Sequence, residues 1–294
     1  MSAHCASTGA APVEDGLQTP LIGPVSGPEL HVMSWNIRRK VPERTARAAD
    51  SWEGRAPRLR SLLRTERPSL LGVQEALPEQ SEFVAESMGS RYRSVGHGRN
   101  ADGSGEGSPL FYDEKRLELL DWEQLALSST PNRLGSRSWG NMIPRMLVTA
   151  TFQDREGPAR FLVVNTHFDH ISRTSRVHSA QAIGRLVAQK GLPAVVMGDL
   201  NAGATSAPLR ELLTAGRLVD SWAVAASQES KEWGTFPNYQ QPRLGRKRID
   251  WILLTPEVRV LRAAINPQGF ADGWASDHLP VQSVLSFPAA DGNP

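Results

Sequence analysis

Polar side chains that could bind a metal or move a proton lie at or just beyond the ends of several apolar, strand-like segments. Carboxylates at such places are costly to bury unless they are paired or bound to a cation. If the acidic groups met at one edge of a sheet, a divalent metal, an imidazolium and amide donors would be needed to offset their repulsion. The side chains concerned are Asn36, Glu75, Asn165, His167, Asp169, Asp199, Asn201, Asp250, Asp277 and His278.

The types of these side chains indicate which metal would suit them. The possible ligands are mostly oxygen atoms, and the chain has a single cysteine, Cys5. One cysteine excludes an internal disulfide framework and any multi-cysteine zinc or iron–sulfur site. Oxygen-rich sites favour Mg²⁺ or Mn²⁺ over zinc.

Short strands are the elements that would position these groups. Apolar runs of strand length, separated by turn-forming residues, predict strands that end close to the polar side chains. The predicted strands cover residues 30–37, 69–76, 109–113, 145–152, 159–168, 193–202, 248–254 and 280–287.

Helices are predicted between some of these strands. Leu59, Leu62 and Leu63 share one helical face in a segment that ends at Pro68. Apolar residues recur at helical spacing from Val177 to Val187, and Gly191 predicts the end of that helix. The glycine- and serine-rich segment 96–109 is predicted to be a flexible loop, and it could cover a substrate. Strands alternating with helices indicate a layered α/β fold with mixed sheets.

Length and composition limit the organisation of the chain. Its 294 residues, of which 39% are hydrophobic and 22% charged, are enough for a packed core and allow one large domain or two small ones. Residues 1–28 are rich in Ala, Gly, Pro, Ser and Thr, and we expect them to form a flexible N-terminal tail. Residues 29–294 are expected to form a single catalytic domain.

Six short motifs, taken together and in order, carry a family resemblance. They are MSWNIR (33–38), GVQEA (72–76), VVNTHFDH (163–170), GDLNA (198–202), RIDWILL (248–254) and SDHLPV (276–281). Each alone is weak, but the series, which spans about residues 32–281, resembles the endonuclease/exonuclease/phosphatase superfamily, also called DNase I-like. The sequence looks most similar to bacterial members whose activity is not assigned.

The resemblance implies a fold and a role for each matching residue. The implied fold is a four-layer αββα sandwich of two mixed β-sheets flanked by helices, with the site at one edge of the sheets. The implied metal-binding residues are Asn36, Glu75 and Asp277. The implied catalytic residues are His167, Asp199, Asn201, Asp250 and His278. By the resemblance, Asp199 and Asn201 position or deprotonate the attacking water and steady the phosphate, His167 and His278 contact the phosphate, and Asp250 supports the site. Arg145, which precedes a strand, is the candidate for binding the substrate phosphate.

The resemblance also implies the reaction. We expect a phosphoester hydrolase dependent on Mg²⁺ or Mn²⁺, in which a metal-activated water attacks phosphorus in line. A phosphodiesterase or nuclease is the main hypothesis. The alternative is a phosphomonoesterase that acts on a small phosphorylated metabolite such as a sugar phosphate. A catalytically silent binding protein with this fold would be expected to lack at least one of these residues, and none is missing.

One motif departs from relatives such as apurinic endonucleases, which carry Asn-x-Asp after the first strand. The corresponding residue here is Arg38, in Asn36-Ile37-Arg38, and a basic residue at that point argues against a fully occupied second metal position. The basic runs 38–40 and 246–248 flank the motifs, and we hypothesise that they form a basic rim for further phosphates. Solvated loops are the alternative.

The remaining expectations concern partners and location. The net charge of +2 is too small to indicate a dedicated duplex-DNA binder, although single-stranded nucleic acid stays possible. No apolar run approaches the roughly 20 residues of a membrane span, and no secretory signal is recognised. A cytoplasmic location is therefore expected, and the oligomeric state is left open.

Overall fold

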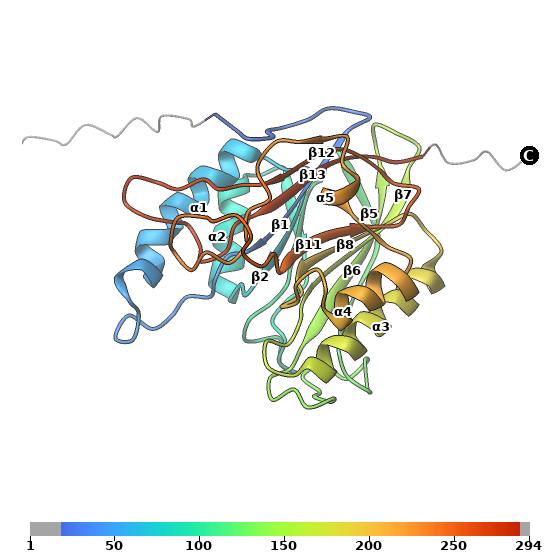
Figure 1. The fold of residues 1–294 in the computed structure, drawn as a ribbon, viewed down its shortest axis with the longest axis horizontal. Coiled ribbons are helices and arrows are strands. Elements are labelled where there is room, and N and C mark those ends of the chain that lie inside the picture. The colour runs from blue at the N-terminus through green and yellow to red at the C-terminus, as the bar shows by residue number, and fades with distance from the viewer. Residues whose placement is uncertain (1–18, 289–294) are drawn as a thin grey trace, which may run out of the picture.

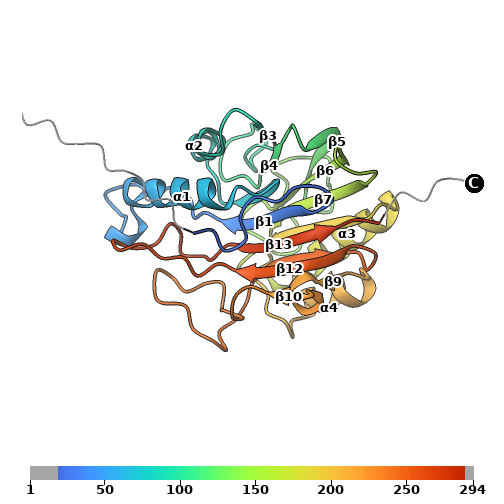
Figure 2. The same cartoon turned by 90° about the horizontal axis from the view of Figure 1, so that it is seen from above.

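Two mixed β-sheets face each other in the computed structural model, which describes residues 19–288 (Figure 1). The first sheet has seven strands in the order β10-β12-β13-β1-β2-β4-β3. Figure 2 shows its neighbouring strands β1, β13 and β12 side by side. The strand bounds are β1 (Leu30–Asn36), β2 (Leu70–Gln74), β3 (Tyr92–Val95), β4 (Leu110–Asp113), β10 (Ser227–Gln228), β12 (Arg259–Ile265) and β13 (Val281–Ser286).

The second sheet has six strands in the order β5-β6-β7-β8-β11-β9. Only the β7–β8 pair is parallel; the other neighbours are antiparallel. The bounds are β5 (Leu117–Ala126), β6 (Met146–Asp154), β7 (Arg160–His167), β8 (Ala194–Asp199), β9 (Val219–Asp220) and β11 (Asp250–Leu254).

Helices cover the outer face of each sheet, so the molecule has four layers (Figure 1). Helices α1 (Trp52–Glu66) and α2 (Pro78–Met88) pack on the first sheet through a cluster that includes Trp35, Leu59 and Val84. Helices α3 (Arg173–Lys190) and α4 (Ala207–Arg210), with the short π-helix Glu211–Ala215, cover the second sheet. The predicted αββα sandwich is confirmed. The remaining short helices are Ala48–Asp50 and α5 (Ser221–Val224).

The central strands β1, β2, β7, β8 and β11 are buried on both faces, which explains their nearly continuous apolar sequences. In β1, Val32 points into the core between the sheets, whereas Trp35 packs against α1 and α2. In β7, Val163 lies between the sheets and Leu162 packs toward α3.

Strand register brings the polar strand ends together at one edge. His167 is aligned with Asp199 across the β7–β8 pair, and Asp199 is aligned with Asp250 across the β8–β11 pair. In the facing sheet, Asn36 is aligned with Gln74, the residue before Glu75. Three motifs far apart in the sequence thus meet at one end of the second sheet, because side-chain alternation fixes the register of buried strands.

Parts of the fold were not predicted. The predicted segments correspond to β1, β2, β4, β6, β7, β8, β11 and β13, but β3, β5, β9, β10 and β12 were missed.

Within the predicted tail, residues 1–18 lie outside the described part, and residues 19–28 contact the domain. The carboxylate of Glu66 accepts hydrogen bonds from the N–H groups of Leu21, Ile22 and Gly23. The division at residue 28 stays a prediction. None of the described helices is long and apolar enough to cross a bilayer.

Gly198 offers a test of this packing. It has a φ of 144°, and an added Cβ would overlap the carbonyl oxygen of Thr166 on the neighbouring strand. Gly198→Ala should lower the free energy of unfolding by on the order of 3 kcal/mol, measured by urea denaturation. Gly54→Ala is the control, because a Cβ in α1 at that point meets its nearest atom at 3.9 Å and should stabilise the helix by up to about 1 kcal/mol. Equal stability of the two variants would contradict the interpretation.

Candidate active site

A cavity of about 490 Å³ opens at the edge where the motif-bearing strands end. Seven of the nine predicted site residues line it: Glu75, Arg145, His167, Asp199, Asn201, Asp277 and His278. The other two, Asn36 and Asp250, are fully buried behind the lining and hydrogen bond to residues in it. The structure therefore brings all nine residues together.

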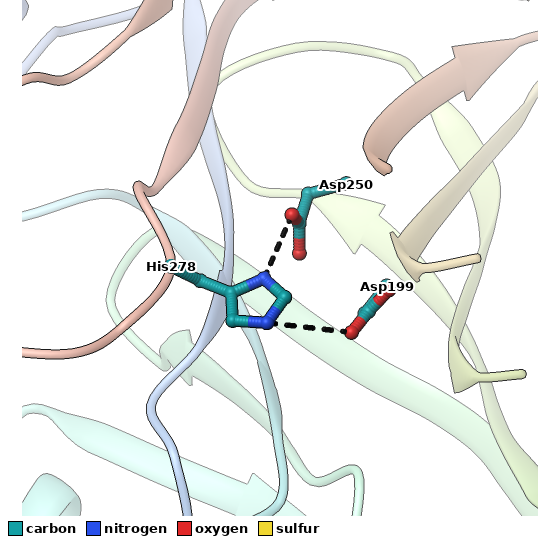
Figure 3. Close-up of side chains that lie close together, drawn as sticks. All are labelled: Asp199, Asp250 and His278. Atoms are coloured by element: carbon teal, nitrogen blue, oxygen red, sulfur yellow. Dashed lines mark hydrogen bonds and ion pairs between the residues drawn. The ribbon is translucent and has the colours of Figure 1, made fainter. Parts of the chain in front are cut away.

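Asp199, Asp250 and His278 form a buried cluster (Figure 3), in which Asp199 and His278 line the cavity and Asp250 lies behind them. The Nδ1 of His278 lies 2.9 Å from Oδ2 of Asp250, and its Nε2 lies 3.8 Å from Oδ2 of Asp199. The indole N–H of Trp35 donates to the backbone carbonyl oxygen of His278. One imidazole ring thus lies between two buried carboxyl groups that come from adjacent strands.

Burial and nearby charge both shift the pKa values of His278 and Asp199. Burial alone would lower the pKa of His278, but the charge and hydrogen bond of Asp250 outweigh it and raise the pKa to about 10. Burial, with the nearby charge of Asp250, raises the pKa of Asp199 to about 7. His278 is therefore an imidazolium at neutral pH, as the sequence led us to expect if Asp250 lay close to it. Asp199 can gain or lose a proton near neutrality.

Asn36 links Asp199 to Glu75. Its side-chain amide donates to Oε1 of Glu75 at 3.1 Å and to Oδ2 of Asp199 at 3.0 Å. Burial opposes ionisation of Glu75, but the hydrogen bond from Asn36 and the charge of His278 outweigh it and lower the pKa of Glu75. Burial raises the pKa of Asp277, although the charge of His278 acts against the rise.

Arg38 places a cation beside these carboxylates. It makes a two-point ion pair with Asp50, at 3.1 and 3.0 Å. The same guanidinium lies 3.7 Å from Oε2 of Glu75 and 3.7 Å from Oδ2 of Asp277. Tyr239 adds a hydrogen bond to Asp50 and so helps to fix the pair. The guanidinium shows that the region between Glu75 and Asp277 attracts positive charge.

Asn201 and His167 form the opposite wall. The Asn201 amide donates to Nε2 of His167 at 3.1 Å and to the carbonyl oxygen of Phe168 at 3.0 Å. Burial, with the charge of Arg145, lowers the pKa of His167 well below its ordinary value. His167 is therefore neutral, and its Nε2 accepts the hydrogen bond from Asn201.

Arg145 both pairs with a carboxylate and lines the cavity. Its Nε lies 3.3 Å from Oδ2 of Asp169, and its Nη2 lies 2.8 Å from Nδ1 of His170. Its Nη1 is buried and has no hydrogen-bond partner among residues 19–288. A buried donor without a partner is costly. A substrate oxygen that accepted a hydrogen bond from Nη1 would remove this cost.

Two groups of side chains could hold a metal. Ligand atoms of Asp199, Asp250 and His278 lie within 4.8 Å of one another. Glu75 and Asp277 offer carboxylate oxygens close to Arg38, with the amide of Asn36 beside them. A protonated imidazole cannot ligate a metal, so the first group already contains its own cation. The second group has only oxygen ligands, which suits Mg²⁺ or Mn²⁺.

Sequence reasoning missed some of the lining. Arg99, Ile143 and Phe236 also face the cavity, and the ring of Phe236 packs 4.8 Å from that of His278. Arg99 belongs to the predicted flexible loop and ion-pairs with Glu106 at 2.8 Å, which supports a role for this loop as a wall. These residues lie in irregular segments with no periodicity that could have identified them.

The hypothesis of a basic rim was wrong for Arg248, which is buried. Arg248 lies 3.8 Å above the Trp251 ring and pairs with Asp220. Arg38 lines the cavity but is already paired with a carboxylate, that of Asp50. The exposed members are Arg39, which lines the first cavity, and Arg246 with Lys247, which line a neighbouring one.

Comparison with known proteins identifies the family. The family model for the endonuclease/exonuclease/phosphatase family matches residues 33–278. The chain belongs to this family. Members of the endonuclease/exonuclease/phosphatase family are phosphoester hydrolases. A comparison with curated protein sequences gives no significant match.

Solved structures of the endonuclease/exonuclease/phosphatase family show the same fold. A family protein from Bacteroides thetaiotaomicron has a TM-score of 0.83 at 27% identity, with 88% of this chain and 98% of that chain covered. A mannosyl-6-phosphatase from the same organism has a TM-score of 0.81 at 28% identity, with 88% and 100% covered. The human nocturnin catalytic domain, at 17% identity, has a TM-score of 0.66 with 89% and 94% covered, which shows the fold alone.

The Asp250–His278 pair gives a pH prediction for the metal-free protein. A raised pKa means that the folded state holds the proton more tightly. The pair's stabilisation is therefore complete below about pH 6.5, and it is lost as the pH rises through about 10. In EDTA, the ring signals of His278 followed by NMR should keep their protonated positions up to about pH 9.

Asp250→Asn removes the main charge that raises this pKa. The His278 midpoint should then fall towards its ordinary value of 6.5. An unchanged midpoint in the variant would show that Asp250 does not control the protonation of His278.

Proposed function

We propose that this protein hydrolyses phosphate esters of small molecules in a metal-dependent, in-line reaction. The observation that carries the proposal is the His278 imidazolium, held by Asp250 beside Asp199 and Asn201, at the base of a cavity that also contains Glu75. A negatively charged ester repels a nucleophile unless nearby positive charge offsets the repulsion. The cavity supplies such charge from His278, Arg145, Arg99 and Arg39.

Glu75 and Asp277 would hold the metal, with Asn36 in support. We favour this group over Asp199, Asp250 and His278, because His278 is bound to Asp250 through a hydrogen bond and carries a proton. When bound, Mg²⁺ or Mn²⁺ would polarise the phosphate and lower the pKa of the attacking water. Arg38 would balance the remaining carboxylate charge.

The chain's own residues account for the rest of the chemistry. Asp199, whose pKa lies near 7, would accept the proton from the attacking water, and Asn201 would orient that water or a phosphate oxygen. His278 would donate a charge-assisted hydrogen bond to the phosphate. The free N–H of Arg145 and the ring of His167 would contact other phosphate oxygens.

Two observations favour a small substrate over a polymer. The cavity of about 490 Å³ falls within the usual range for small-molecule sites. A relative at 28% identity, which this chain covers completely, is a mannosyl-6-phosphatase. We therefore place the phosphomonoester of a small metabolite first. The phosphodiesterase hypothesis comes second, because the same groups can act on a diester.

Hydrolysis of two chromogenic esters tests the proposal. The purified protein should cleave p-nitrophenyl phosphate faster than bis-p-nitrophenyl phosphate in Mg²⁺ or Mn²⁺, and EDTA should abolish the activity. Preference for the diester would promote the phosphodiesterase hypothesis. If both esters are inert, a panel of phosphorylated metabolites and nucleotides follows, because small esters lack remote binding contacts. Inactivity throughout that panel would contradict the proposal.

Glu75→Gln tests the placement of the metal. Replacing a charged oxygen ligand with a neutral amide should weaken Mn²⁺ binding at least tenfold by calorimetry and lower kcat by about 100-fold or more. Glu82→Gln is the matched control, since it removes the same charge from an exposed position of α2. If both variants bind Mn²⁺ like the wild type, Glu75 is not a ligand.

A further inference from the structure

A second cavity, of about 540 Å³, opens beside the candidate active site. Phe236 and Ile249 line both cavities, so the two share a wall. Phe236 is also the residue whose ring packs against His278. A ligand bound at His278 could therefore extend past Phe236 into the second cavity.

The lining of this second cavity is basic and rich in hydrogen-bond donors. Its charged residues are Arg243, Arg246 and Lys247, all exposed and without an ion-pair partner among residues 19–288. Its amide side chains are Asn238, Gln240 and Gln241, and no carboxylate of the described part of the chain lines it. Unpaired cations around a concave site create a positive potential that attracts anions.

Residues 234–249, which form this cavity, are anchored to the candidate active site. The hydroxyl oxygen of Thr235 accepts hydrogen bonds from the backbone N–H groups of Ile249 and Asp250, and its carbonyl oxygen accepts one from Leu279. The N–H of Asn238 donates to the carbonyl oxygen of Asp277. The second cavity is thus fixed relative to Asp250, Asp277 and the residue that follows His278.

Close backbone packing closes the segment on itself. A Cβ added to Gly234 would collide with the side chain and backbone of Arg246, so the two limbs of the segment lie in contact. The N–H of Gly234 donates to the carbonyl oxygen of Arg243 at 3.3 Å. This packing holds Arg246 and Lys247 just before β11, which begins at Asp250, and both residues line the cavity.

We propose that the second cavity binds a further anionic group of the substrate whose scissile phosphate lies at His278. This inference rests on the proposed function for the orientation of the substrate, and it names the substrate class as a phosphate ester with a second phosphate or carboxylate. Phe236 packs against the part of the molecule between the two anions. Arg246 and Lys247 bind the second anion, and the neighbouring amides contribute neutral hydrogen bonds.

The test compares ligand pairs that differ only in a second phosphate. One pair is a hexose 6-phosphate and the hexose 1,6-bisphosphate, and the other is thymidine 5′-monophosphate and thymidine 3′,5′-bisphosphate. Each ligand is measured as an inhibitor of p-nitrophenyl phosphate hydrolysis by the full chain with Mn²⁺. Calorimetry in EDTA repeats the comparison without any need for catalysis.

The variant for this test is Arg246→Gln with Lys247→Gln. Its control is Arg64→Gln with Arg185→Gln, which removes the same charge from exposed positions of α1 and α3 and keeps good helix formers there. The wild type and the control should bind the bisphosphate of at least one pair tenfold or more tightly than its monophosphate. The variant should lose most of that preference.

Each result decides the proposal. A preference confined to the sugar pair or to the nucleotide pair supports it and identifies the source of the second anion. Equal binding of mono- and bisphosphates by the wild type, in both pairs, overturns it, and so does a preference that the variant retains. A wild type that hydrolyses no ester contradicts the proposed function, whereas the calorimetric preference still tests the second cavity on its own.

Discussion

Two buried carboxyl groups, Asp199 and Asp250, lie in register on neighbouring antiparallel strands, and the rest of the site is arranged around them. Two negative charges in this position repel each other strongly in a medium of low dielectric constant. The His278 ring between them relieves the repulsion by carrying a proton, which leaves Asp199 with a pKa near neutrality. Strand pairing therefore fixes the two carboxyl groups, and the buried loop before β13 supplies the imidazole between them.

Backbone conformation at the strand ends directs the other side chains into the cavity. Arg38, Glu75 and Asn201 each have a positive φ, of 58°, 62° and 47°, directly after or near the end of a strand. Such conformations cost non-glycine residues on the order of 1 kcal/mol each and persist only where the surroundings fix them. The buried guanidinium of Arg55 helps to do so, because it donates to the carbonyl oxygens of Ile37, Arg38 and Arg39.

The sequence predicted the central strands and the polar residues at their ends, because burial on both faces leaves a continuous apolar run that stops abruptly at a polar group. It did not predict β5, whose half-exposed residues mix polar and apolar side chains like those of a loop. It predicted nine site residues through motifs, and the structure places these nine residues close together. It missed Phe236 and Arg99, because loop residues are placed by tertiary contacts such as those of Thr235 and Glu106. It also misjudged Arg248, since exposure cannot be inferred for one residue in a basic run.

Arg38 also bears on how the protein folds before any metal binds. Its guanidinium, fixed by Asp50, lies beside Glu75 and Asp277, so these acids have a covalently attached counter-ion before any metal arrives. Small zinc domains, by contrast, stay unfolded until their ion binds. We expect this chain to fold without an ion, because Arg38 already offsets the charge of these two acids. Any metal that Glu75 and Asp277 bind would then be taken up by the folded protein, so its identity would depend on the ions that surround the folded protein.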